Sequence, residues 1–370
     1  MRKKILHSTL PIFFCAACIY LAAASYHVAT TTAPDFLVYY YAARDAVTQV
    51  SPYTDPHLVT VFTYPPPTLL LLLPFTLLSP DAAQAMFVLV NAVCMLAVPF
   101  LALRFVGIRS RSWYYASAAL LIFAFPTKFT LGMGQINAIA ITTLLTGWLL
   151  MNRRRTIAAL CIAAACLAKP VLGFTLIVLV VRRRDILRLT LAWAGAASVL
   201  GAAIIGVRLY NDYWHHIVPR LSDYAGREVY YNQGITGFVA RLTEQSSIRQ
   251  VISSVALILG IGLTASASVF SRSLPRQAAI AITVLLIVDP LSWQHHFMWL
   301  IVPFLLAAHA SRSSRERFFI ALSYLLVAVN IADPQQVWIL ARSHGLYGAG
   351  ILLGVLLYQS IGNNAVNIRE

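Results

Sequence analysis

The chain has 370 residues, of which 59% are hydrophobic and 11% are charged. Soluble globular proteins contain about 25% charged residues, so the charges here are too few to cover a water-soluble fold. The formal net charge of +15 is also found in nucleic-acid-binding proteins, but membrane proteins keep cationic loops on the cytoplasmic side. We therefore expect one integral membrane domain over residues 1–370, in contact with membrane lipid and without a nucleic-acid partner.

Apolar stretches recur along the chain, several of them near the 20 residues that cross a hydrocarbon core of roughly 30 Å. Residues 2–28 are also similar to a signal peptide, but their apolar part continues past Ala22 to Ala24 without a convincing cleavage site. The pair 156–168 and 171–181 is interrupted by Lys169 and Pro170, so it is either two spans or one kinked span. The stretches predict an all-α bundle of about twelve transmembrane helices, at residues 5–28, 82–105, 113–127, 134–151, 156–168, 171–181, 188–207, 250–271, 277–289, 296–310, 318–332 and 346–361.

The basic residues predict the orientation of these spans. With a cytoplasmic N-terminus, the inner segments hold 19 of the 28 Lys and Arg residues but only three of the 13 acidic residues. Clusters of Lys and Arg beside spans stay in the cytoplasm. We therefore expect both termini inside and two long outer loops, at residues 29–81 and 208–249. The apolar run at 69–78 is too short to span and predicts an interfacial or re-entrant helix.

Asp35 is the first candidate for chemistry, because it follows the first span within a few residues. One interpretation is that it serves as the N-cap of a short helix, a position that Asp favours. A carboxylate at the outer edge of a span, near aromatic residues such as Tyr39, is also a candidate general base, since partial burial raises its pKa. Tyr64 is followed by three prolines, which predict a rigid turn.

Three polar residues interrupt apolar sequence further along. Gln135 and Asn137 follow Gly134 at an expected outer helix start, where both amides can hydrogen-bond a sugar. Lys169 is a cation between two apolar runs, and ionisable residues at membrane depth are usually functional. It suits an anionic headgroup; the alternative is a lysine whose ammonium reaches the outer surface.

Two clusters lie in the second half of the chain. Residues 230–237 combine tyrosines with Asn232 and Gln233 and are followed by Arg241, a composition typical of sugar binding but also of a turn before a helix. Residues 289–296 combine an aspartate, Trp293 and two histidines. Neighbouring side chains on a helix point roughly 100° apart, so we expect one histidine to face the site as a phosphate contact or proton carrier and no shared metal.

Six of these segments, in this order, resemble glycosyltransferase family 87, the polyprenyl-phosphate-sugar-dependent enzymes of the C-type membrane glycosyltransferase superfamily. Its best-known members are mycobacterial mannosyltransferases that extend phosphatidylinositol mannosides. The sequence departs from the family pattern at Gly234, where we expect a serine. The resemblance rests on residues 35–43, 64–66, 134–137, 168–170, 232–241 and 292–296.

The resemblance implies a C-type glycosyltransferase bundle with short juxtamembrane helices in the first outer loop. It implies a catalytic aspartate, carried by Asp35, and an important histidine, which is either His295 or His296. We expect Lys169, one of these histidines and Arg241 to stabilise the phosphate of the donor. The residues expected to contact the sugar or the acceptor are Tyr39, Tyr64, Gln135, Asn137, Asn232, Gln233 and Trp293.

The expected function is transfer of one sugar, with mannose as the expected sugar, from a polyprenyl phosphate carrier to a hydroxyl of a glycolipid or another envelope glycan. The lipid-linked donor and the acceptor would meet at the outer face of the bacterial plasma membrane. One carboxylate acting as base implies inversion, and no cofactor is expected. The alternative is a transporter or flippase for lipid-linked sugar or another anionic solute, which needs gates on both sides and often has inverted repeats; none is visible in the sequence.

Overall fold

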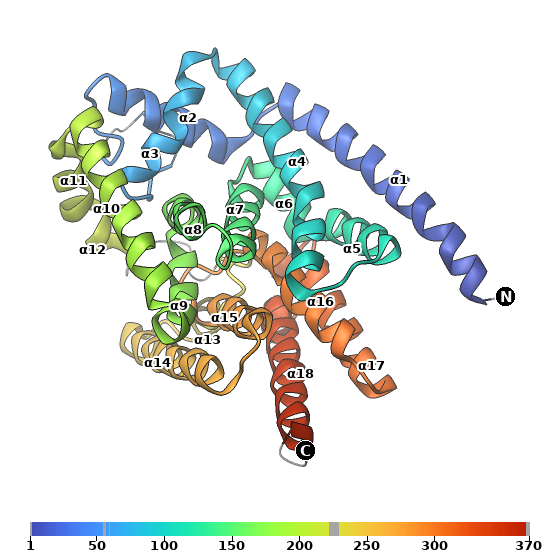
Figure 1. The fold of residues 1–370 in the computed structure, drawn as a ribbon. Helices are drawn as coiled ribbons and strands as arrows, with labels where there is room; N and C mark the ends of the chain where they lie inside the picture. The colour runs from blue at the N-terminus through green and yellow to red at the C-terminus, as the bar shows by residue number, and fades with distance from the viewer. Residues whose placement is uncertain (1, 55–56, 59, 222–228, 368–370) are drawn as a thin grey trace. The chain divides into compact units, whose positions relative to one another are not determined.

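The computed structural model describes residues 2–54, 57–58, 60–221 and 229–367, with side chains from residue 9 to residue 361 of these ranges. The described residues form helices and no strand (Figure 1). Asn232 and Trp293 form an isolated antiparallel bridge. The predicted all-α fold is therefore confirmed.

Five helices of the described part are long and apolar enough to cross a membrane. Two further helices, α5 (Arg111–Phe123) and α6 (Phe125–Met133), pass the same test together but are bent by 60° between them. The structure thus supports a polytopic membrane protein, while the predicted number of twelve spans stays a prediction. The five long helices are α1 (Arg2–Thr30), α4 (Pro80–Val106), α10 (Arg184–Ile205), α14 (Ser246–Phe270) and α18 (His344–Asn367).

The break predicted at Lys169 and Pro170 is present. Helix α8 (Arg155–Ala168) ends directly before it, and a 3₁₀ turn, η2 (Pro170–Thr175), leads into α9 (Leu176–Arg182). Proline cannot donate the backbone hydrogen bond that would continue α8, and its ring restricts the residue before it. Lys169 accordingly has extended backbone angles, φ −141° and ψ 93°.

The chain folds into two compact units, each described by itself below. Unit 1 contains residues 1–101, 129–173 and 185–225, and unit 2 contains residues 102–128, 174–184 and 226–370.

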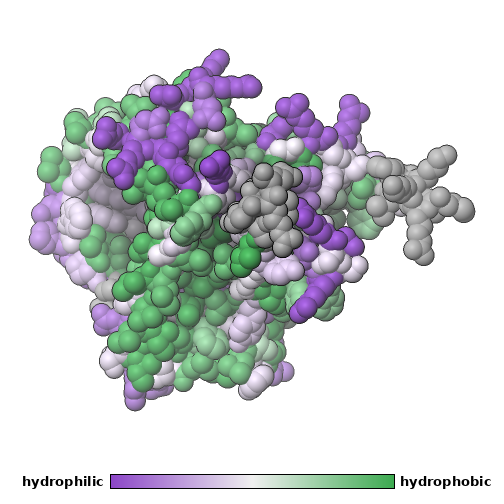
Figure 2. All heavy atoms as spheres, turned by 60° about the horizontal axis from the view of Figure 1, so that its bottom comes forward, coloured by the Kyte–Doolittle hydropathy of each residue, from purple (hydrophilic) through white to green (hydrophobic). Residues whose placement is uncertain are grey.

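Figure 2 shows broad hydrophobic areas on the face turned towards the viewer, with hydrophilic residues gathered in separate clusters. Hydrophobic areas of this extent suit a surface covered by lipid.

Unit 1 carries the short helices predicted for the first outer loop. They are α2 (Pro34–Val47), α3 (Pro67–Leu72) and the 3₁₀ turn η1 (Leu73–Leu77). Phe36 of α2 is fully buried, and its ring centroid lies 4.8 Å from that of Phe87 and 6.0 Å from that of Phe75. This aromatic cluster fixes α2 against α4 and η1.

The other helices of unit 1 include α7 (Asn137–Leu150), which packs along α8 (Figure 1). The predicted second outer loop is itself helical at its start and end. It contains α11 (Val207–Asp212), a π-helical turn η3 (Tyr213–Ile217), α12 (Val218–Leu221) and, in unit 2, α13 (Ile235–Leu242). Residues 222–228 of that loop lie outside the described residues.

Unit 2 is built around α15 (Leu274–Val288), whose residues from Gln277 to Leu286 are all buried. Helices α14 and α18 pack against α15, and α17 (Ser314–Ala328) packs along α18. The chain leaves α15 through a 3₁₀ helix, η4 (Gln294–Leu300), which continues into α16 (Ile301–Ala310). Two shorter 3₁₀ turns, η5 (Pro334–Gln336) and η6 (Ile339–Ser343), precede α18.

Candidate active site

Asp35 lies in the first turn of α2, one residue after Pro34. The N-cap position belongs to Ala33, which makes no side-chain cap bond, so the interpretation of Asp35 as an N-cap is wrong. Proline at the start of a helix places the cap one residue earlier, because its fixed φ suits the first helical position. The Asp35 carboxylate instead accepts a hydrogen bond through Oδ2 from the side-chain amide of Gln135, 100 residues further along.

Gln135 is held in turn by two tyrosines. The Tyr39 hydroxyl donates to Gln135 Oε1 over 2.9 Å and lies 2.9 Å from the Tyr64 hydroxyl. The two tyrosine rings meet edge to face, with centroids 5.4 Å apart. We call Asp35, Tyr39, Tyr64, Gln135 and Lys169 the Asp35 cluster; all five lie in unit 1.

Gly134 allows the loop before α7 to reach the start of α2. Its φ is +69°, in the left-handed region that glycine adopts without steric cost. A Cβ atom at this position would lie 2.8 Å from the Cβ atoms of both Ala33 and Phe36. The glycine is therefore what permits the close approach that sets Gln135 beside Asp35.

Lys169 completes the cluster at the break between α8 and α9. Its side chain is 5% exposed, and Nζ lies 5.3 Å from the centroid of the Tyr64 ring, within cation–π range. The segment around Tyr64 is tied to the same break, because the Thr68 hydroxyl donates to the Leu167 carbonyl over 2.6 Å. The predicted alternative, an ammonium reaching the surface, does not describe this buried side chain.

Burial dominates the electrostatics of the cluster. It raises the pKa of Asp35 above the usual value for a carboxyl, and the hydrogen bond from Gln135 and the charge of Lys169 act in the opposite direction. Burial also raises the pKa of Tyr39 well above its usual value, with the neighbouring Tyr64 and Asp35 adding to the effect. Tyr39 is therefore a hydroxyl donor at neutral pH, and Asp35 is a stronger base than an exposed aspartate.

Asn137 is close in sequence to the cluster but has a different environment. It is the first residue of α7 and is fully buried, with its amide donating to the Thr130 hydroxyl over 3.3 Å. The structure places it inside the packing of unit 1 rather than among the Asp35 cluster. Its predicted sugar contact stays a prediction.

Asn232 and Gln233 of unit 2 are fully buried and bind backbone groups. The Asn232 amide donates to the Pro290 carbonyl over 3.0 Å, and the Gln233 amide donates to the carbonyls of Tyr230 and Arg342. The Gln233 side chain also accepts from the Gly345 N–H over 2.8 Å. Both residues therefore join three chain segments of unit 2, in addition to any role in sugar binding.

Gly234 explains the departure from the family pattern. A Cβ atom here would lie 2.9 Å from the Asp289 carbonyl oxygen and 2.9 Å from Cβ of Ser292. Contacts below 3.0 Å require a neighbour to move, so a serine would not fit without rearrangement of the 289–292 turn. Glycine in this chain matches the close packing of the two segments.

Arg241 also binds the backbone. Its guanidinium donates to the carbonyls of Val229 and Asn232 and to the Ser343 hydroxyl, over 3.1, 2.9 and 2.6 Å. Burial lowers the pKa of Arg241 to about 10, so the side chain stays cationic at neutral pH. A phosphate contact would use a group that already holds the 229–232 segment, and that role stays a prediction.

The two histidines lie on the 3₁₀ helix η4, not on an α-helix. His295 and His296 are 4% and 3% exposed, and their rings meet edge to face with centroids 4.6 Å apart. Neighbouring residues of a 3₁₀ helix point about 120° apart, yet the two rings lie against each other. Which of the two histidines contacts a phosphate stays a prediction. His295 stacks on the half-buried Trp293 ring, and His296 stacks on the Trp299 ring.

Asp289, which the sequence placed in this cluster without a role, lies next to His296. Its Oδ2 atom is 3.9 Å from His296 Nδ1. His344, which no sequence pattern indicated, forms a hydrogen bond with the Tyr230 hydroxyl over 2.6 Å. The two residues are 114 positions apart in the sequence, so no local motif predicts this contact.

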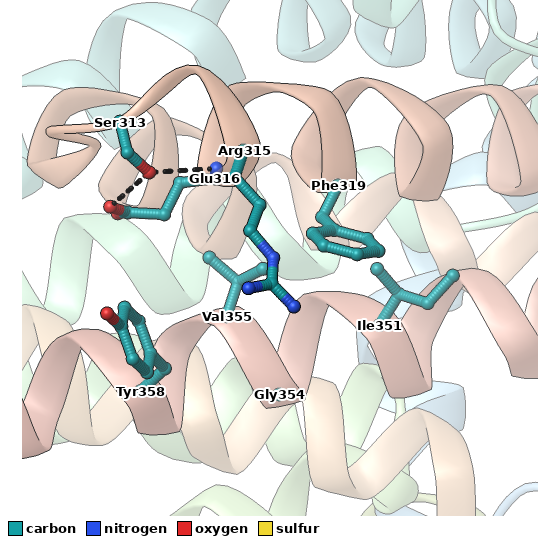
Figure 3. Close-up of a pocket in the computed structure, with 8 residues that line it drawn as sticks. All are labelled: Ser313, Arg315, Glu316, Phe319, Ile351, Gly354, Val355 and Tyr358. Atoms are coloured by element: carbon teal, nitrogen blue, oxygen red, sulfur yellow. Dashed lines mark hydrogen bonds between the residues drawn. The ribbon is translucent and has the colours of Figure 1, made fainter.

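A groove lies between α17 and α18 of unit 2 (Figure 3). Arg315 extends across it, and Glu316 is bonded to Ser313 at its end. The predicted site residues are not part of its lining. The groove is lined by Ser313, Arg315, Glu316, Phe319, Ile351, Gly354, Val355 and Tyr358.

The described part of the chain is helical and contains several membrane-length helices, which places it in the class of polytopic membrane proteins. It also holds a half-buried carboxylate near a buried lysine, a polar site suited to acid–base chemistry. The family model of glycosyltransferase family 87 matches residues 62–303. The match covers more than half of the chain, so the chain belongs to glycosyltransferase family 87 and the resemblance seen in the sequence is confirmed. Asp35 precedes the matched range, whereas Gln135, Lys169 and the two histidines fall within it.

Two mycobacterial proteins are similar to the chain, and both are named polyprenol-phosphate-mannose-dependent alpha-(1-2)-phosphatidylinositol mannoside mannosyltransferase. The protein of Mycolicibacterium smegmatis is 24% identical over 304 residues, 74% of this chain and 67% of the relative. The protein of Mycobacterium tuberculosis is 24% identical over 257 residues, 65% of this chain and 60% of the relative. The chain thus spans about two thirds or less of the length of these relatives.

Proposed function

We propose that the chain transfers one mannosyl residue from a polyprenyl phosphate carrier to a hydroxyl group of a glycolipid or another envelope glycan. Membership of glycosyltransferase family 87 supports the reaction class, and the names of the two relatives support the donor and a glycolipid acceptor. The observation that carries the proposal is the Asp35 cluster, where a buried cation and a carboxylate of raised pKa occur together. Family membership also favours a transferase over the transporter alternative.

In the proposed reaction Asp35 is the general base. It takes the proton of the acceptor hydroxyl as that oxygen bonds to the anomeric carbon of the sugar. The bond between the anomeric carbon and the phosphate oxygen breaks, and its electron pair leaves with the phosphate. A phosphate leaves without protonation, so a general acid is unnecessary. A single displacement inverts the anomeric configuration.

Lys169 has the properties of a phosphate ligand in this scheme. A buried cation near hydrocarbon is costly unless an anion accompanies it, and the donor brings a phosphate attached to a lipid tail. Charge-assisted hydrogen bonds to phosphate are stronger than neutral ones. For His295, His296 and Arg241, phosphate contact is proposed on the family resemblance, and either histidine can fill the role.

The direct test uses the purified full chain in detergent with polyprenyl phosphate mannose, labelled in the sugar, and a phosphatidylinositol mannoside acceptor. Transfer of label to the acceptor, with release of unlabelled polyprenyl phosphate, is the expected result. A protein that moves the intact donor across vesicles but never transfers its sugar would be a transporter, and the proposal would be withdrawn.

Replacing Lys169 with methionine is expected to raise the KM for the lipid donor about tenfold or more, and the KM for the acceptor far less. Methionine keeps the length of the side chain but removes the charge, and a hydrogen bond to a charged group is worth roughly 1.5–3 kcal/mol. Steady-state kinetics with each substrate varied in turn give the two constants. Lys128→Met, the same change at an exposed position, is the matched control. Equal, mild losses on both substrates would show that Lys169 acts through packing.

We propose that the site faces outward, with both termini in the cytoplasm, in a bacterial plasma membrane. In a variant without the five native cysteines, Ser247→Cys should react with a membrane-impermeant thiol reagent on intact cells. Ser314→Cys should react only after permeabilisation. Both positions are exposed, so access to the reagent depends on the side of the membrane. The reverse labelling pattern would overturn the orientation.

A further inference from the structure

The hydrogen bonds of the Asp35 cluster run in one direction. A tyrosine hydroxyl has a single proton, and that of Tyr39 goes to Gln135 Oε1. The 2.9 Å contact between the Tyr39 and Tyr64 hydroxyls is then donated by Tyr64. Gln135 turns its carbonyl towards Tyr39 and its NH₂ group towards Asp35 Oδ2. In this series of hydrogen bonds, every donor thus points towards the carboxylate.

The Asp35 carboxylate fixes which way round the Gln135 amide lies, because an ionised carboxylate only accepts hydrogen bonds. Rotating it by 180° would set its carbonyl oxygen against the Asp35 carboxylate, and two acceptors facing each other repel. Gln135 is 7% exposed, and its carbonyl and one N–H already bind within the protein. An amide held in this way is poorly placed to rearrange around a sugar.

We infer that Gln135 is a positioning residue for Asp35: it holds Oδ2 of the carboxylate and thereby leaves Oδ1 as the atom that accepts the proton of the acceptor hydroxyl. The inference rests on the proposed role of Asp35 as base, and it replaces the expected sugar contact of Gln135. A base fixed in this way is already oriented towards the proton of the acceptor hydroxyl when the acceptor binds. This prior alignment is the source of the catalytic effect of a positioned group.

The pH dependence of turnover separates a positioning residue from a sugar ligand. Asp35 is active when it is deprotonated, so kcat/KM falls on the acidic side as pH falls through its pKa. The bond from Gln135 lowers that pKa. Removing the bond therefore raises the pKa and moves the acidic limb of the profile to higher pH, whereas loss of a sugar contact alone leaves the limb in place.

The test is Gln135→Met in the purified full chain, assayed with polyprenyl phosphate mannose and acceptor. Methionine is similar in length but cannot donate to the carboxylate. We expect kcat to fall about 10-fold to 100-fold, as for a misaligned catalytic group, with little change in either KM and with the acidic limb at higher pH. An unchanged limb together with a raised KM for donor or acceptor would overturn the inference.

Gln84→Met is the matched control, because it is the same change at another buried glutamine of unit 1. Gln84 accepts from the Ala33 N–H and donates to the Val28 carbonyl, so its loss loosens the start of α2 without touching the carboxylate. Its acidic limb should stay in place; an equal shift would assign the effect to general loosening and overturn the inference.

Two further variants keep the test decisive. If Gln135→Met does not purify in folded form, Tyr39→Phe removes the donor to Gln135 Oε1 and should shift the limb in the same direction by less; no shift would overturn the inference. Asp35→Asn tests the base itself. If it stays active, the proposed function of Asp35 fails, whereas an inactive Asp35→Asn beside an unshifted Gln135→Met removes only the inference about Gln135.

Discussion

Asp35→Asn is expected to lower the rate of mannosyl transfer at least about a hundredfold, since general-base catalysis contributes roughly 10²–10⁴-fold. Asparagine keeps the shape of the side chain, and its carbonyl can still accept the bond from Gln135. It lacks a group that takes up a proton at neutral pH. Turnover of purified protein, measured together with binding of the lipid donor, separates loss of chemistry from loss of binding.

Asp45→Asn is the matched control for this variant. It makes the same change on the same helix, nearly three turns further along α2, and it should leave turnover close to that of the unmodified chain. Near-normal turnover of Asp35→Asn would reduce Asp35 to a residue that favours the start of a helix through its negative charge.

Gly134→Ala is expected to have the second largest effect, lowering turnover by about a hundredfold, the scale of a misplacement of about 1 Å near the reacting groups. The added Cβ would lie 2.8 Å from the Cβ atoms of Ala33 and Phe36, which forces α2 and the loop before α7 apart. The left-handed backbone at Gly134, with φ +69°, adds about 1–2 kcal/mol of strain for alanine. Turnover and thermal unfolding of the purified protein measure the two consequences.

Gly132→Ala provides the comparison, because Gly132 lies two residues earlier in α6. Among the described residues, and leaving out the chain neighbours and the backbone of its own helix, no heavy atom lies within 4 Å of a Cβ added to Gly132. The φ of Gly132 is not in the left-handed region. This variant should keep both turnover and thermal stability. If both glycine variants behave alike, the approach of the loop to α2 does not control the site.

Local features were predictable from the sequence where covalent geometry decides them. Pro170 has no backbone N–H, so the end of α8 at Ala168 could be expected, and the prolines after Tyr64 likewise predicted the turn before α3. The juxtamembrane helices of residues 29–81 were also expected, because an apolar run of about ten residues cannot span a membrane.

The partners of the polar side chains were not predictable in the same way. The contact between Asp35 and Gln135 joins residues 100 positions apart and depends on how α2 packs against the loop before α7. Asn232 and Gln233 have the chemistry of sugar ligands, yet the structure uses their amides on backbone carbonyls that only the fold brings near. The contact between the rings of His295 and His296 could not be predicted either, because the rings of Trp293 and Trp299 pack beside them.

The bond from Thr68 to the Leu167 carbonyl changes how two sequence motifs should be viewed. Pro170 interrupts the hydrogen bonding of α8 just after Leu167, and the hydroxyl that follows the three prolines supplies a donor to a carbonyl at that interrupted end. The tyrosine–proline motif and the lysine–proline motif thus form one connected structural element, joined by this hydrogen bond. In evolution they should change together: a relative that lacks the proline after its lysine has no need of a hydroxyl at the position of Thr68.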